Sequence, residues 1–104
     1  MVFIEAAPFT KYLRDYLNDD EYGELQSFLI EQPEAGDLIQ GTGGLRKLRW
    51  GLDNKGKRGG IRVIYYWQVS EDQIYLFTLY AKNEMSDLSS DEKKALKKML
   101  EDWQ

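Results

Sequence analysis

The sequence predicts a single α+β domain, in which an antiparallel sheet carries a helical pair on one face and a C-terminal helix follows, in the order β-α-α-β-β-β-α. Three observations predict this fold. The 104 residues suffice for one hydrophobic core but not for two. Seven Tyr, four Phe and three Trp supply large side chains for that core. Apolar residues recur at helical spacing near both ends of the chain, and they alternate with other residues in the middle.

The first third of the chain predicts a strand followed by two helices. Residues 2–5 form a short apolar run that Pro8 interrupts, as expected of a strand leaving the sheet. Thr10 is the expected cap of the first helix, and the polar residues 18–20 end that helix and offer caps for the next one. The expected buried positions are Tyr12, Leu13, Tyr16 and Leu17 in the first helix, and Tyr22, Leu25, Phe28 and Leu29 in the second, which ends at or before Pro33.

The middle of the chain predicts three neighbouring strands. Residues 33–44 are rich in glycine and polar side chains and are expected to form an ordered loop that enters the sheet. Three segments then alternate in the manner of strands, LRKLRW (45–50), IRVIYYW (61–67) and IYLFTLYAK (74–82). A glycine-rich tip and a short turn near Ser70 join them, which predicts an antiparallel meander.

Strict alternation predicts which side chains share a face of each strand. In the first of the three strands, Leu45, Lys47 and Arg49 share a face, and in the second Arg62, Ile64 and Tyr66 do so. In the third strand, alternation separates the set Tyr75, Phe77 and Leu79 from the set Leu76, Thr78, Tyr80 and Lys82.

The C-terminal residues predict an amphipathic helix. Ser89 followed by Glu92 forms a capping box at its start. An apolar stripe then runs along the helix beside four lysines. We expect this stripe to pack on the core, and docking of a partner is the alternative. The stripe comprises Ala95, Leu96, Met99, Leu100 and Trp103, and the lysines are Lys93, Lys94, Lys97 and Lys98.

Positive charge is concentrated in one segment of an otherwise acidic chain. The segment from Arg46 to Arg62 holds seven Lys and Arg residues and one acid, a net charge of +6, whereas the rest of the chain carries −10. A strip of this density indicates a polyanion or an acidic protein as partner, and a solvated hairpin tip is the alternative.

Two absences restrict the chemistry. The chain has no histidine and no cysteine, so the commonest transition-metal ligands and the usual acid/base side chain are missing. No metal or other cofactor is therefore expected, and any catalysis must use Lys, Arg, Tyr, Asp or Glu. No segment approaches the roughly 20 apolar residues of a membrane span, and a soluble cytoplasmic protein that contacts no membrane is expected.

The basic segment contains groups suited to cleaving RNA without a metal. That reaction requires a base for the ribose 2′-OH, in-line positioning, cations for the phosphate and an acid for the leaving oxygen. Arg and Lys supply the cations for the phosphate, and a Lys or Tyr crowded by other cations can serve as the base. The meander is expected to bring Arg49, Arg62, Tyr66 and Lys82 together, with Lys55, Lys57 and Arg58 on the joining hairpin.

The aromatic residues of the second strand offer a different use of the same surface. Tyr65, Tyr66 and Trp67 are candidates for stacking on single-stranded bases, although alternation turns half of them toward the core. A basic cluster by itself fits a nuclease, a passive RNA or DNA binder and a docking site for an acidic protein equally.

Three tracts resemble a known family. GDLIQGTGGLRKLRW, NKGKRGGIRVIYY and LYAKNEMSDLS, in this order and before a basic amphipathic helix, resemble the HigB branch of the RelE/ParE superfamily, the toxins of type II toxin–antitoxin pairs. The resemblance extends from Phe3 to Trp103 and implies one RelE-like domain over residues 1–104. It also implies a ribosome-dependent endonuclease that cleaves mRNA in the A site through 2′-OH attack on the adjacent phosphate.

The resemblance further implies a partner and a set of site residues. The partner is a cognate antitoxin, usually a HigA-like helix-turn-helix protein, which alone would contact operator DNA. Arg62 matches the phosphate-stabilising arginine of the family's G-x-R strand. The family's Tyr or His after the last strand has no counterpart in MSDLSS, which leaves the general base open. The expected catalytic residues are Arg62, Lys57, Lys82 and Tyr66, and the expected RNA-binding residues are Lys47, Arg49, Lys55, Arg58 and Asn83.

Two other functions remain open for this family and fold. The superfamily includes ParE-type toxins that poison DNA gyrase, and a noncatalytic RNA-binding domain is a third class. The cations lie along the predicted sheet and hairpin, where a phosphate backbone would bind, and this favours the nuclease.

Overall fold

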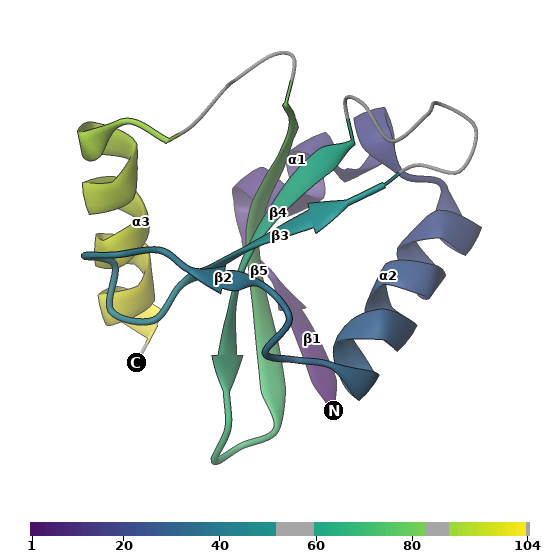
Figure 1. Ribbon diagram of the computed structural model, residues 1–104, viewed down its shortest axis with the longest axis horizontal. Coiled ribbons are helices and arrows are strands. Elements are labelled where there is room, and N and C mark those ends of the chain that lie inside the picture. Colours follow the sequence, from purple (N-terminus) through teal and green to yellow (C-terminus); the bar gives the residue numbers. More distant parts are fainter. Residues whose placement is uncertain (52–59, 83–87, 104) are drawn as a thin grey trace.

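The computed structural model describes residues 1–51, 60–82 and 88–103. A five-stranded sheet crosses the middle of the domain, with α1 and α2 on one face and α3 on the other (Figure 1). The elements are β1 (Val2–Glu5), α1 (Ala7–Tyr16), α2 (Asp19–Glu31), β2 (Asp37–Leu38), β3 (Arg46–Trp50), β4 (Ile61–Gln68), β5 (Gln73–Ala81) and α3 (Ser90–Trp103).

The sheet has the strand order β1-β5-β4-β3-β2. The meander of β3, β4 and β5 is antiparallel, as predicted, and the α+β fold class is confirmed. The sheet is mixed rather than wholly antiparallel, because β1 pairs with β5 in parallel. Residues 6–72 separate these two strands, so no tight turn forces them to run in opposite directions. The predicted loop of residues 33–44 contains the two-residue strand β2, which pairs with β3.

Each face of the sheet has its own hydrophobic core. Val63 and Tyr65 of β4 point toward α1 and α2, where Phe9 and Leu25 are fully buried. Ile64 of β4 points the other way, toward α3. The α3 face is completed by the inner residues of α3 and by the aromatic side chains Tyr75, Phe77 and Tyr80 of β5. Both cores are therefore built on the alternation of β4.

Helix α1 begins earlier than the sequence predicts. Its first residue is Ala7, and Pro8 lies in its first turn, where the missing N–H of proline costs no hydrogen bond. Thr10 therefore lies inside the helix and does not cap it; its hydroxyl donates to a Glu5 carboxylate oxygen at 2.6 Å. Tyr12, expected to be buried, is 40 % exposed, and Phe9 takes the core position instead.

The other two helix starts agree with the sequence. The Asn18 side chain accepts from the Glu21 N–H at 2.8 Å, and the Glu21 carboxylate accepts from the Asn18 N–H at 2.9 Å. Ser89 and Glu92 form the same reciprocal pair at the start of α3, at 3.1 and 2.8 Å. Both capping boxes satisfy backbone donors that have no partner within the helix.

A register shift in the β4–β5 pair changes which side chains share a face. Ile64 lies opposite Thr78, whereas Tyr65 lies opposite Leu76, so β5 carries an extra residue at this point. The strict alternation predicted for residues 74–82 is therefore wrong beyond Phe77. Leu79 packs toward α1 and α2, and Tyr80 lies on the α3 face.

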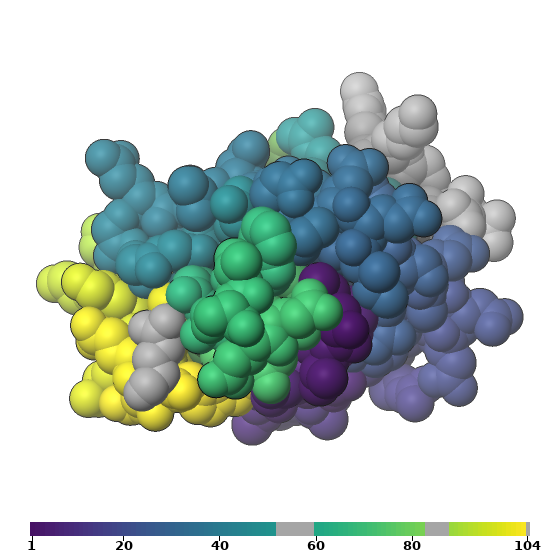
Figure 2. All heavy atoms as spheres, turned by 90° about the horizontal axis from the view of Figure 1, so that it is seen from below, coloured from purple at the N-terminus to yellow at the C-terminus, as the bar shows by residue number. Residues whose placement is uncertain are grey.

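The turn between β4 and β5 lies beside the N-terminus. Figure 2 shows these residues, green and purple, side by side on the lower face. The N-terminal ammonium forms a salt bridge with Asp72 at 3.3 Å, and the Val2 N–H donates to the Asp72 carbonyl at 3.2 Å. None of the described helices has the length and apolar character needed to cross a membrane.

Candidate RNA-binding and catalytic site

A row of polar side chains crosses three strands on the α3 face of the sheet. Arg62 of β4 lies directly opposite Arg49 of β3 on one side and Tyr80 of β5 on the other. Residues directly opposite each other in an antiparallel pair share a face, with Cβ atoms about 5 Å apart. The neighbours of Arg62 in β4, Ile61 and Val63, point into the core beside α1 and α2. Arg62 therefore points to the α3 side of the sheet. The two predicted arginines therefore meet.

The close approach of β3 and β4 beside this row depends on a glycine. Gly60 precedes β4 and is buried. A Cβ atom at Gly60 would lie 2.6 Å from the Trp50 carbonyl oxygen, so any larger residue would push the two strands apart. This gives a physical reason for the glycine in the G-x-R pattern of Gly60, Ile61 and Arg62.

The Arg62 guanidinium is unusual in its burial. Only 9 % of the residue is exposed, and its Nη1 makes a long hydrogen bond, 3.4 Å, to the carbonyl of Ile61. Within the described residues, neither Arg62 nor Arg49 takes part in a salt bridge. Two like charges directly opposite in a sheet repel each other, and burial adds to the cost. An anion bound between them would offset both terms.

Other basic side chains border the arginine row. Lys47 lies two residues before Arg49 on the same face of β3 and opposite Ile64. Lys82 follows β5, is exposed, and donates its backbone N–H to the Gly60 carbonyl at 3.3 Å. Two residues along a strand span roughly 6.6 Å, so Lys82 and Tyr80 lie near each other at this end of the sheet.

Tyr66 lies apart from the arginine row. It shares a face with Arg62, as predicted, but the two residues are four positions apart, which is roughly 13 Å along the strand. Its ring is 6.1 Å from that of Tyr75, and a Cβ atom at Gly44 would lie 2.9 Å from it. Along the strand, Tyr66 therefore lies farther from Arg62 than the directly opposite Arg49 and Tyr80 do, and its role at the site stays a prediction.

The neighbouring aromatic residues of β4 serve the core. The Tyr65 hydroxyl is fully buried, donates to the Pro33 carbonyl at 2.7 Å and accepts from the Gly36 N–H at 2.9 Å. Trp67 packs against the same core. Tyr65 thus holds the segment after α2 against the sheet and is not available to stack on a base.

Four predicted site residues lie outside the described part of the chain. They are Lys55, Lys57, Arg58 and Asn83. Among the residues that the structure does describe, no group of three or more acidic side chains is arranged to hold a metal ion.

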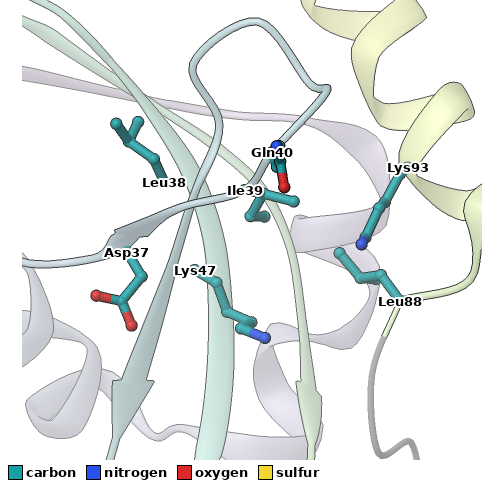
Figure 3. Close-up of a pocket in the computed structure, with 7 residues that line it drawn as sticks. All are labelled: Asp37, Leu38, Ile39, Gln40, Lys47, Leu88 and Lys93. Carbon is teal, nitrogen blue, oxygen red and sulfur yellow. The ribbon is translucent and has the colours of Figure 1, made fainter.

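Sequence reasoning missed two residues at this site. Alternation predicts Tyr80 on the face opposite Phe77. The extra residue of β5, which no local pattern marks, puts both on the α3 face, with Tyr80 beside Arg62. Lys93 of α3 is one of the four lysines that the sequence predicts beside the apolar stripe, without a role at the site. It lines a polar cavity of about 210 Å³ together with Lys47, Leu88 and residues 37–40 (Figure 3).

The sequence matches one family over nearly its full length. The family is described as the RelE toxin of the RelE/RelB toxin–antitoxin system, and the match covers residues 3–104. The chain therefore belongs to the RelE toxin family. It is a RelE-like toxin of a toxin–antitoxin system.

Solved structures of E. coli RelE share this fold. The isolated RelE toxin superposes with a TM-score of 0.57 at 14 % identity, covering 94 % of this chain and 97 % of that chain. A RelE mutant in the free state superposes with a TM-score of 0.55 at 17 % identity. The match covers 82 % of this chain and 86 % of that chain. RelE in the intact RelBE toxin–antitoxin complex superposes with a TM-score of 0.54 at 16 % identity. The match covers 75 % of this chain and 92 % of that chain. At these identities the likeness shows the fold.

Proposed function

We propose that this chain is a ribosome-dependent mRNA endonuclease that cleaves mRNA in the A site and so inhibits translation. The observation that carries the proposal is the row in which Arg62 lies between Arg49 and Tyr80. Two guanidinium groups on one face, within reach of the same anion, suit a phosphate that gains negative charge during the reaction. Membership in the RelE family supports the same activity.

The proposed reaction needs no metal ion. The ribose 2′-oxygen forms a bond to phosphorus while its proton passes to a base, and the bond from phosphorus to the 5′-oxygen breaks as that oxygen takes a proton. The products are a 2′,3′-cyclic phosphate and a 5′-hydroxyl. Arg62 and Arg49 stabilise the pentavalent phosphate, and the buried Tyr80 lies beside Arg62 on the next strand.

The general base is drawn from the predicted candidates. Of these, Lys82 borders the arginine row, Tyr66 lies roughly 13 Å from Arg62 along the strand, and Lys57 lies outside the described residues. Position therefore favours Lys82 over Tyr66. Lys47, with Lys55, Arg58 and Asn83, is proposed to hold the RNA backbone on either side of the reacting phosphate.

The proposal extends to the branch and the partner. The three sequence tracts support assignment to the HigB branch, with a HigA-like helix-turn-helix antitoxin as partner. That antitoxin would provide the contact with operator DNA. One of the similar structures is RelE bound to a peptide of its antitoxin RelB, which supports an antitoxin partner for this chain.

The proposal is tested with purified toxin and ribosomes carrying a defined mRNA. Cleavage should yield a 2′,3′-cyclic phosphate end, and a single 2′-deoxy nucleotide at the cut should abolish it. Naked mRNA should remain intact. Cleavage of the 2′-deoxy substrate would eliminate 2′-OH attack. Bound but uncut mRNA would favour a noncatalytic RNA-binding domain, and a DNA damage response in cells without mRNA cuts would favour gyrase poisoning.

A further inference from the structure

The polar cavity lined by Lys47 and Lys93 lies beside the arginine row, at the opening between the sheet and α3. It encloses about 210 Å³ and is formed by residues 37–40, by Lys47 of β3 and by Leu88 and Lys93 at the start of α3. Figure 3 shows the Lys47 and Lys93 side chains extending toward the same space from opposite sides. Segments far apart in the sequence thus place two ammonium groups at one cavity.

The charges around the cavity favour an anion. Lys93 is half-buried, and within the described residues its ammonium forms no salt bridge. One acid, Asp37, also lines the cavity; it lies opposite Lys47 in the β2–β3 pair, on the far side of the Lys47 side chain from α3 (Figure 3). The lining therefore carries a net positive charge, with both cations on the α3 side of Asp37.

We propose that this cavity binds a second phosphate of the RNA strand, next to the phosphate held by Arg49 and Arg62. This inference rests on the proposed function. Lys47 and Arg49 lie two residues apart on one face of β3, a distance of roughly 6.6 Å, which is comparable with the separation of neighbouring phosphates along an RNA strand. The strand would then run across β3 toward the start of α3, with Lys93 as a binding residue.

The cavity has room for a phosphate. Its volume of about 210 Å³ accommodates one phosphate group and part of its hydration shell. A flexible Lys acts as a point charge and tolerates a solvated phosphate without fixed geometry.

The proposal is tested by titrating the isotopically labelled wild-type toxin with a short RNA oligonucleotide methylated at every 2′-oxygen, which cannot be cleaved. Amide signals of Lys47, Lys93 and residues 37–40 should shift together with one dissociation constant. Lys93→Gln should raise that constant about fivefold and lower the salt slope by about 0.7, the value for one lost contact with a single strand.

A matched control distinguishes the effect of a lysine at the cavity from the effect of a lysine elsewhere on α3. Lys97 lies on the same helix one turn later and is exposed, so Lys97→Gln removes the same charge outside the cavity. It should leave the dissociation constant nearly unchanged, whereas Asp37→Asn should lower the constant because it removes a repelling carboxylate. Equal effects of Lys93→Gln and Lys97→Gln, or no shifts at residues 37–40, would overturn the proposal.

Failure here is distinguishable from failure of the proposed function. If Lys93→Gln binds and cleaves like the wild type while the ribosome assay still yields cyclic phosphate ends, the cavity is not a phosphate site and the nuclease stands. If the oligonucleotide binds at the cavity but ribosome-bound mRNA stays intact, the cavity is an RNA site on a protein that does not cleave.

Discussion

At the scale of single residues, the burial and position of Arg62 give the proposed phosphate site its main support. A buried guanidinium opposite a second arginine, with no salt bridge among the described residues, destabilises the free protein. An arrangement that costs stability is typical of a site prepared for a ligand of opposite charge. The sequence predicts that Arg62 and Arg49 come together, because they lie on neighbouring strands of the meander, and the structure places them directly opposite each other.

The first prediction concerns Arg62→Ala. Removing the cation should lower the rate of mRNA cleavage roughly 100- to 1,000-fold, by analogy with loss of one oxyanion donor. The domain should stay folded, because the change also removes repulsion with Arg49. Arg14→Ala is the control: this exposed arginine of α1 pairs with Asp19, away from the α3 face, and its loss should leave cleavage intact. Full activity of a folded Arg62→Ala protein would place the catalytic site elsewhere.

The second prediction concerns Tyr65→Phe, which removes a hydroxyl that makes one buried and one part-buried hydrogen bond. Leaving the Gly36 N–H and the Pro33 carbonyl without their partner should cost about 1–3 kcal/mol of the free energy of unfolding. Denaturant unfolding at neutral pH measures this loss. A cost near zero would mean that Tyr65 does not hold the segment after α2.

The pH dependence of Tyr65→Phe provides an independent measurement. Burial raises the pKa of Tyr65 above its ordinary value, so the folded state holds the phenolic proton more tightly than the unfolded chain does. This stabilisation is complete below the unfolded pKa of about 10 and is lost as the pH rises through the folded pKa. The variant should therefore lose less stability than the wild type between neutral pH and about pH 11.

At the scale of elements, sequence patterns predict the features that depend only on residues close together in the chain. Both capping boxes, the helical face of α2 and the alternation of β3 and β4 are local, and the structure has all of them. The extra residue of β5 and the parallel direction of β1 depend instead on contacts between distant segments. No short-range pattern encodes such contacts, which is why alternation alone predicts the wrong face for Tyr80.

The third prediction uses the two glycines that flank the β3–β4 connection. Gly60→Ala would place a Cβ atom 2.6 Å from the Trp50 carbonyl oxygen, which belongs to the backbone and cannot rotate away. The strands must separate, at a cost of about 1–3 kcal/mol, and Arg62 should shift relative to Arg49 and lose cleavage activity.

Gly51→Ala is the matched control for that change. A Cβ atom at Gly51 meets nothing within 4 Å, so the free energy of unfolding should change by no more than about 0.5 kcal/mol. Thermal unfolding and the ribosome cleavage assay, applied to both variants, measure the difference. Equal behaviour of the two variants would show that close approach of β3 and β4 is not required.

At the scale of the whole molecule, the segregation of charge is organised by the fold. The basic segment supplies β3 and the start of β4, whereas the acidic residues are concentrated elsewhere, including the first turn of α2. The structure therefore collects Lys47, Arg49 and Arg62 on the α3 face. The sequence could not predict that α3 would bring Lys93 to the same face, because helix packing across a sheet depends on the complete fold.

The fourth prediction concerns the antitoxin. An acidic segment of the antitoxin should bind this basic surface, or add a strand at the edge formed by β1, without unfolding the toxin. The association rate should fall as salt rises, because charges are screened beyond about 8 Å at physiological ionic strength. Hydrogen exchange should show protection on residues 45–51, on β4, on β1 or on α3. A salt-independent rate with protection confined to other residues would contradict this.

Cleavage of translated mRNA is tested most directly by mapping mRNA 5′ ends in cells after brief induction of the toxin, with Arg62→Ala as the inactive control. New 5′ ends should appear inside translated reading frames within minutes, and they should vanish when translation initiation is blocked. Protein synthesis should stop at the same time. New ends that persist without translation, or growth arrest with normal protein synthesis and unbroken mRNA, would contradict a ribosome-dependent endonuclease.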